Sequence, residues 1–280
     1  MARQEKEIEI GVPKEIASGV YWMEAGKGLM RSNVYFVRSG RSWTLIDAAS
    51  AKCGRSIQKA AESLFGTNPR PDSILLTHYH PDHAGSALEL AQAWRCPVYV
   101  HTDELPLTAE DISAVKEYSN PLDRWIVLPL LRVMPPRKVQ AILAQGSIKA
   151  VARALDPSAG VPGLPDWECI HAPGHTPGHV AYFRPGDRVL ITGDAIVTVN
   201  LNSLSGLLLH KQRLSGPPRY TTWSWPAAKG SAALLAQLEP RVLAGGHGAP
   251  IAGPTTALDV QASLGAEGPR GAQGRRPLEL

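Results

Sequence analysis

One short stretch of the chain is dense in groups that bind metal ions: residues 78–83 read His-Tyr-His-Pro-Asp-His. Histidine supplies neutral nitrogen and aspartate supplies anionic oxygen, a mixture that suits zinc and also admits manganese, iron or cobalt. His78 and His80, two positions apart at the end of an expected strand, can point to one side and share an ion. Asp82 and His83 follow where the chain turns and can reach a second ion. The stretch therefore predicts half of a two-metal site.

Further ligands should lie at the ends of other strands, because a site at a sheet edge gathers side chains from several strands. Three residues have that setting: His175 in a glycine-rich turn, Asp194 after a glycine that ends a strand, and His247 among three glycines. A histidine between glycines can be an ordinary turn residue. A turn that aims its side chain at a metal also needs glycines, so all three are candidate ligands.

Other polar residues near these strand ends have two interpretations each. Asp47 ends a strand near the same edge and could hydrogen-bond a ligand histidine. His171 and His179 could orient ligands or be ordinary strand residues. His101 and His210 are expected to be structural or exposed.

The elements that would position residues 78–83 form a strand, a loop, a helix and a strand. This unit favours a parallel sheet with the reactive loop at the carboxyl edge of its strands. Alternating and continuous apolar runs predict strands at 19–24, 33–37, 43–47, 73–77, 98–100, 167–171, 179–184, 188–192 and 241–243. Apolar residues at helical spacing predict helices at 54–65, 85–94 and 226–238.

Residues 102–160 differ from the rest, because helical segments broken by prolines replace the strand pattern. We expect a helical insertion over the active site. Its acids gather in 103–123 and its bases in 124–155, which contains no acid. Either the two segments pair through their charges, or the second forms a basic rim that faces an anionic substrate.

A second irregular stretch, 201–225, carries basic and aromatic residues. Its Tyr220, Trp223 and Trp225 could line a substrate cleft. Core packing or a homodimer contact is the commoner fate of such aromatic residues.

Composition sets the remaining limits. The 280 residues, 44% of them hydrophobic, can form one catalytic domain over 1–260, followed by a polar tail at 261–280 expected to be disordered. The net charge of +4 is small, so no nucleic-acid partner is expected. Three cysteines without a CxxC pair favour a reducing, cytoplasmic setting, and no apolar run is long enough to suggest a membrane partner.

The motifs HxHxDH, GHTPGH, GD and GGHG, in this order, resemble those of the metallo-β-lactamase-fold hydrolase superfamily over residues 15–255. The resemblance implies an α+β fold, a four-layer αββα sandwich with a helical insertion. It also implies a ligand set for two divalent ions, zinc in the first place and manganese or iron as alternatives. The first metal would bind His78, His80 and His175, the second Asp82, His83 and His247, and Asp194 would bridge both.

Two cations about 3.5 to 4 Å apart can hold a bridging water as hydroxide near neutral pH, and this hydroxide is the expected nucleophile. Asp82 could carry a proton to the leaving group as a catalytic residue. Asp194 argues against a true β-lactamase, which generally has Cys or Ser at that position. A GCGR-like segment, typical of glyoxalase II and the persulfide dioxygenases, is absent after Asp194.

These departures leave a hydrolase of a lactone, ester or thioester, acting on a small-molecule substrate with an apolar portion. Phosphodiester or phosphate-ester hydrolysis is the first alternative, since residues 124–155 lack acids. Mono-iron sulfur oxidation is the second. A metal-bound scaffold without activity is disfavoured, because purely structural sites usually close with four ligands, mostly thiolate and imidazole.

Overall fold

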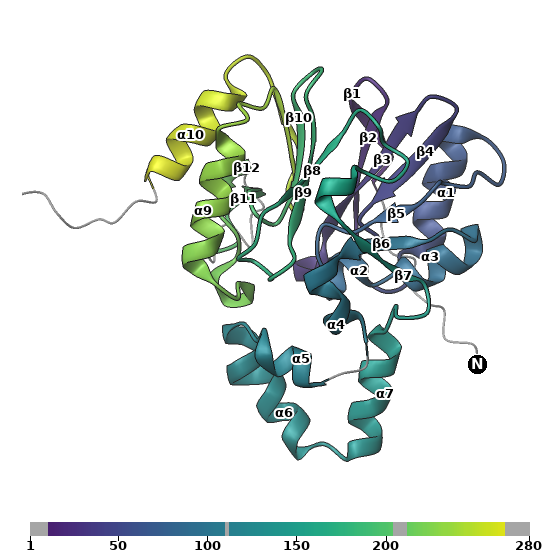
Figure 1. Cartoon of the computed structure of the whole chain (residues 1–280), viewed down its shortest axis with the longest axis vertical. Coiled ribbons are helices and arrows are strands. Elements are labelled where there is room, and N and C mark those ends of the chain that lie inside the picture. The colour runs from purple at the N-terminus through teal and green to yellow at the C-terminus, as the bar shows by residue number, and fades with distance from the viewer. Residues whose placement is uncertain (1–10, 110–111, 204–211, 267–280) are drawn as a thin grey trace, which may run out of the picture.

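Two β-sheets lie face to face with helices on both outer sides, as the computed structural model shows for residues 11–109, 112–203 and 212–266 (Figure 1). Within these ranges the first sheet holds seven strands: β1 Lys14–Ala17, β2 Val20–Ala25, β3 Ser32–Ser39, β4 Ser42–Ile46, β5 Ile74–Leu75, β6 Val98–His101 and β7 Ala152–Leu155. The second sheet has the order β14-β13-β10-β9-β8: β8 Glu168–His171, β9 Val180–Arg184, β10 Val189–Gly193, β13 Val242–Gly245 and β14 Ile251–Ala252.

Strand β3 shows why the sheets are covered on both faces. Side chains alternate along a strand, so the consecutive apolar residues 34–37 in the middle of β3 require burial on both faces. Val34 and Phe36 pack toward the helices α1 (Gly54–Phe65) and α3 (Ala87–Trp94). Tyr35 and Val37 pack between the two sheets.

The second sheet completes the sandwich. Its inner face contributes Val180 and Ile191 to the core shared with the first sheet. Its outer face packs against α9 (Trp225–Ala236) and α10 (Thr256–Ala266), through Leu235 and Val260. The layers are therefore helix, sheet, sheet and helix, and the expected αββα architecture is confirmed.

Parallel pairing brings the chemically interesting loops to one edge. Strands β4, β5 and β6 run parallel, so the loops after them leave the first sheet on the same side. In the second sheet β10 and β13 are also parallel, with Gly193 opposite Gly245, and the antiparallel β9 begins where they end. Asp47, residues 78–83, His175, Asp194 and His247 all follow or precede these strand ends.

The helical insertion projects from the sandwich as a separate lobe (Figure 1). It begins with the 3₁₀ turn Thr102–Glu104 and contains α4 Leu105–Thr108, α5 Ile112–Glu117, the π-helical turn Asp123–Val127, α6 Leu128–Val133 and α7 Pro136–Gly146. The expectation of helices over 102–160 fails at its end. Residues 152–155 form β7, which pairs with β6 because Ala152 and Leu155 belong to the two sheet cores. No ion pair joins 103–109 or 112–123 to 124–155, so charge pairing of these segments is not seen in the part of the insertion that the structure describes.

Two further expectations change toward the C-terminus. The stretch 201–225 is not wholly irregular, since β12 Gln212–Ser215 pairs with β11 Val197–Val199. Residues 261–266, expected to begin a disordered tail, continue α10, whereas 267–280 lie outside the described residues, as does His210. No helix among the described residues has the length and apolar character needed to span a membrane.

Candidate metal centre

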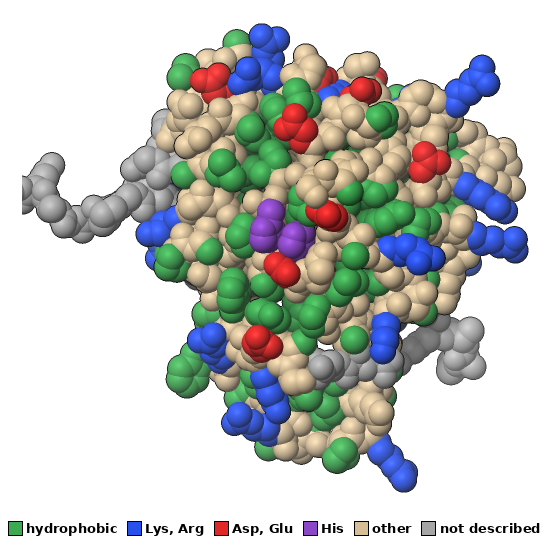
Figure 2. Space-filling view, viewed as in Figure 1, with side chains coloured by type: hydrophobic (Ala, Val, Ile, Leu, Met, Phe, Trp, Pro, Cys, Tyr) green, Lys and Arg blue, Asp and Glu red, His purple; other side chains and the backbone are tan. Residues whose placement is uncertain are grey.

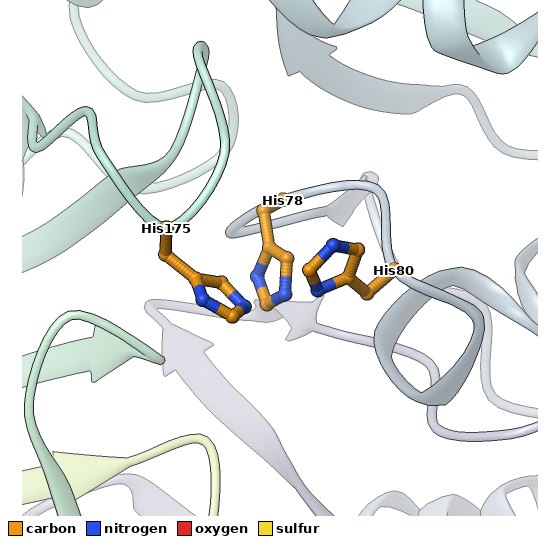
Figure 3. Close-up of side chains that lie close together, drawn as sticks. All are labelled: His78, His80 and His175. Carbon is orange, nitrogen blue, oxygen red and sulfur yellow. The ribbon is translucent and has the colours of Figure 1, made fainter. Parts of the chain in front are cut away.

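Three histidines form the first group of the site (Figure 3). His78 and His80 stand on the loop after β5, and His175 stands on the turn before β9. Their ring centroids lie 4.7 Å (His78 to His80), 4.7 Å (His78 to His175) and 4.6 Å (His80 to His175) apart. One nitrogen from each ring lies within 4.8 Å of the others, which suits a shared ion.

Asp82, His83 and His247 form a second group by the same measure. Asp82 and His83 belong to the short helix α2 (Pro81–Ala84), and His247 follows β13. The Nε2 atom of His247 lies 3.4 Å from Asp82 Oδ2, and that of His83 lies 3.9 Å from the same oxygen. The exposed fraction of the Asp82 side chain is 16%, against 4% for Asp194, so Asp82 is the more accessible carboxylate.

Asp194 stands between the two groups. Its Oδ2 is 3.2 Å from His175 Nε2 and 3.4 Å from His247 Nε2, while its Oδ1 is 3.4 Å from His83 Nε2. The close approach of Asp194 to His83 requires a glycine at position 246, just before His247, because a Cβ there would lie 2.7 Å from His83 Cε1. All seven residues expected to bind metal are thus brought together, and Asp194 lies between the two groups.

Hydrogen bonds to Nδ1 turn the Nε2 atoms toward the centre. His83 Nδ1–H donates to Asp47 Oδ2 over 2.8 Å, and His247 Nδ1–H donates to the carbonyl of Arg31 over 2.7 Å. A carboxylate or carbonyl oxygen can only accept, so in the neutral rings the proton sits on Nδ1 and Nε2 keeps a lone pair. The expectation that Asp47 hydrogen-bonds a candidate ligand is confirmed.

In the first group, threonine hydroxyls contact Nδ1 of His78 and His175 and so turn their Nε2 atoms toward the centre. Thr77 Oγ1 donates to Asp47 Oδ2 over 2.8 Å and can accept from His78 Nδ1–H, 3.0 Å away. Thr222 Oγ1 donates to the Pro218 carbonyl and lies 3.2 Å from His175 Nδ1. Each hydroxyl has one proton, already donated, so each imidazole supplies the other proton and presents an unprotonated Nε2 to the centre.

The inward atoms fit a metal better than they fit one another. The Nε2 atoms of His78, His83 and His175 and the Oδ1 atom of Asp194 are buried without a hydrogen-bond partner among the described residues. When the rings are neutral, these atoms are acceptors facing acceptors, an arrangement that is costly unless a proton or a metal ion places positive charge between them. Imidazole nitrogens with carboxylate oxygens form a donor set that suits divalent ions such as zinc.

The pKa shifts differ between the first and the second group of histidines. Burial and the neighbouring His83 hold the pKa of His78 well below its usual value, and enclosure with the nearby His175 ring lowers the pKa of His80 to about 3. Burial would also lower the pKa of His83 and His247, but the neighbouring carboxylates, Asp194 foremost, together outweigh burial and raise the pKa of both rings. Burial alone would raise the pKa of Asp194, yet His247 and His83 hold it well below its ordinary range.

Three further histidines among the described residues, His101, His171 and His179, lie around the turn that carries His175. His179 Nε2 accepts from the amide of Asp194 over 3.1 Å, and His171 Nε2 donates to the Pro177 carbonyl over 3.0 Å. His101 stacks on His171 with centroids 4.2 Å apart and planes 10° apart. His101, Asp103 and His171 lie near enough to share an ion, but stacked rings aim their lone pairs side by side rather than at one point.

Several supporting residues carry no signal in the sequence: Thr77, Thr222 and Glu104 bond ring nitrogens or loop amides. Among the aromatic residues for which a substrate cleft, core packing and a dimer contact are the alternatives, Trp223 packs edge-to-face on Tyr118 of the insertion, with centroids 5.8 Å apart. The amide of Trp223 donates to the His175 carbonyl over 3.0 Å, so the insertion contacts the stretch that holds this turn. Figure 2 shows histidine side chains near the middle of one face, with acidic side chains beside them and hydrophobic ones around.

Comparison with known proteins agrees with this geometry. The chain is 35% identical over 251 residues to Probable metallo-hydrolase YflN of Bacillus subtilis, covering 88% of this chain and 90% of that protein. It is 24% identical over 201 residues to Acyl-coenzyme A thioesterase MBLAC2 of Gallus gallus, covering 65% of each. The crystal structure of the metallo-beta-lactamase family protein TTHA1429 from Thermus thermophilus shares the fold, with a TM-score of 0.64 at 21% identity over 90% of this chain and 79% of that one.

The family model of the metallo-beta-lactamase superfamily matches residues 28–247, a span that contains every candidate ligand and most of both sheets of the sandwich. The chain therefore belongs to the metallo-beta-lactamase superfamily.

Proposed function

We propose that this protein hydrolyses a lactone, ester or thioester of a small substrate at a centre of two divalent ions, with zinc the first choice and manganese or iron the alternatives. His78, His80 and His175 would hold one ion, Asp82, His83 and His247 the other, and Asp194 would contact both. The observation that carries the proposal is the set of buried acceptor atoms facing one another without a donor between them among the described residues.

The bound pair of cations would supply an activated water and polarise the scissile carbonyl. The chain's own residues prepare this chemistry. The lowered pKa values of His78 and His80 keep these rings neutral and ready to donate a lone pair. Asp82 would take a proton from water and pass it to the leaving oxygen or sulfur, and the partial exposure of its carboxylate to solvent supports this role.

Two observations bear on the substrate. One relative is named as an acyl-coenzyme A thioesterase, which supports a thioester or ester. The insertion exposes apolar side chains, with Trp125 81% and Leu130 57% exposed, and these are available to an apolar portion of the substrate. Because residues 124–155 contain bases and no acid, a phosphate ester is the second candidate.

A substrate panel tests the proposal. Wild-type protein is stripped with a chelator, reconstituted separately with zinc, manganese or iron, and assayed on a lactone, an aryl ester, an acyl thioester and bis(p-nitrophenyl) phosphate. We expect turnover of at least one of the three carbonyl substrates, lost on chelation and regained on adding metal. Faster turnover of the phosphodiester would favour the second candidate. Absence of carbonyl hydrolysis across the panel would refute the proposal, and iron-dependent oxygen consumption would indicate an oxygenase.

A further inference from the structure

A buried carboxylate lies behind the first group of histidines. Glu104 ends the 3₁₀ turn Thr102–Glu104, where the insertion leaves β6, and Glu104 is fully buried. Its Oε2 accepts from the amide of Tyr79 over 2.8 Å, and its Oε1 accepts from the amide of Gly178 over 2.7 Å. Hydrogen bonds to a charged acceptor are among the stronger ones in proteins, so both contacts constrain the loops that make them.

Those two amides belong to the loops that carry the three histidines. Tyr79 stands between His78 and His80, and Gly178 comes three residues after His175. The loops are far apart in sequence, since Glu104 is 25 residues from Tyr79 and 74 from Gly178. One side chain therefore spans the gap between the two segments whose side chains must converge.

The glycine at position 178 is part of the same contact. A Cβ built there would lie 2.7 Å from Glu104 Cγ and 2.9 Å from His101 Nδ1. Any larger residue would push the turn away from the carboxylate. The close fit on both sides indicates that the distance between the loops is set at this point.

We propose that Glu104 is a positioning residue, which sets the mutual geometry of His78, His80 and His175 and thereby the affinity of that group for its ion. Glu104 acts through the backbone of the two loops, because its carboxylate oxygens accept from their amides. The other group is held by contacts that Glu104 does not make: His83 bonds Asp47, and His247 bonds the Arg31 carbonyl. The inference rests on the proposed function only in that the three histidines bind a metal.

The variant Glu104→Gln tests this with little change of shape. Its amide offers one acceptor oxygen, while its NH₂ faces a backbone N–H, so one loop loses its partner. Glu168→Gln, at an exposed position on β8, is the matched control. Zinc titration of the metal-free proteins by calorimetry is the readout, and His80→Ala identifies which binding step belongs to the three-histidine group.

We expect Glu104→Gln to weaken that step by about 10- to 100-fold, the usual effect of losing a residue that orients ligands, and to leave the other step and the control unchanged. Wild-type affinity at both steps in folded Glu104→Gln would overturn the inference. If this variant does not fold, Gly178→Ala perturbs the contact between Glu104 and the Gly178 amide from the other side. It should likewise weaken zinc binding at the three-histidine step alone, and wild-type affinity at both steps would overturn the inference. A wild type that binds two ions but hydrolyses nothing would refute the proposed function and leave this inference standing.

Discussion

The two halves of the metal centre are built on different principles. The half formed by His78, His80 and His175 contains no acid of its own; the pKa values of His78 and His80 are lowered, and threonine hydroxyls contact the rings of His78 and His175. The other half combines His83 and His247, whose pKa values are raised, with the carboxylates that raise them. One half therefore depends on geometry and the other on charge, which means that different substitutions should damage each.

Asp194 is the residue that belongs to both halves, so its loss should have the largest effect. Asp194→Ala removes oxygens that lie 3.2 to 3.4 Å from three imidazole nitrogens. We expect binding of both ions to weaken and turnover to fall to the uncatalysed background, measured with the best substrate of the panel. Asp166→Asn, at an exposed position, should behave as wild type. Retention of one tight site and substantial activity in Asp194→Ala would show that the halves are independent.

Asp82 tests the charged half alone. We expect Asp82→Ala to lower turnover by about 10²- to 10⁴-fold, the range for loss of a proton-transfer group, while the three-histidine group still binds one ion. Steady-state kinetics and metal analysis on the same sample check this. If the fold, the metal content and every hydrolytic activity survived, the centre would be structural rather than catalytic.

Asp47 should link the halves from behind. Its carboxylate accepts from His83 Nδ1–H and from Thr77, which in turn contacts His78. Its backbone has a φ of 59°, a left-handed conformation that Asp and Asn tolerate better than most residues. Asp47→Asn preserves that preference but loses an acceptor, and we expect affinity for both ions to fall by about 10- to 100-fold. Affinity lost at one step only would separate the halves.

Thr222 should give the smallest effect, because it contributes one hydrogen bond between its hydroxyl and the imidazole of His175. Thr222→Val removes the acceptor for His175 Nδ1–H. A bond of this kind contributes about 1 kcal/mol, so we expect about a fivefold to tenfold loss of affinity at the three-histidine step. An equal loss at the other step would contradict the assignment of Thr222 to one half.

The candidate ligands could be predicted from the sequence because each is marked by its immediate neighbours in the chain. Four of them lie within six consecutive residues, and His175, Asp194 and His247 each follow a glycine at the end of an expected strand or in a turn. The helix at 54–65 could be predicted for the same reason, since its apolar residues repeat at helical spacing along its whole length. A local sequence pattern therefore predicts a residue or helix whose conformation depends mainly on its neighbours in the chain.

The supporting residues depend on contacts that no local pattern records. Glu104 bonds amides 25 and 74 residues away, and Thr222 reaches a histidine 47 residues away. Strand β7 could not be predicted because its four residues, Ala-Arg-Ala-Leu, are too few to show a period, and pairing with β6 decides their conformation. The opposite pKa shifts of His78 and His83 likewise arise from packing, since Asp194 and Asp47, the two carboxylates that raise the pKa of His83 most, come from distant parts of the chain.

The central claim is that seven side chains form one site for two ions, and metal stoichiometry tests it most directly. Metal-free wild-type protein is titrated with zinc by calorimetry, and bound metal per chain is confirmed by elemental analysis after dialysis. We predict two ions per chain, with hydrolytic activity complete only when both are bound. Saturation at one ion per chain with full activity would contradict the account.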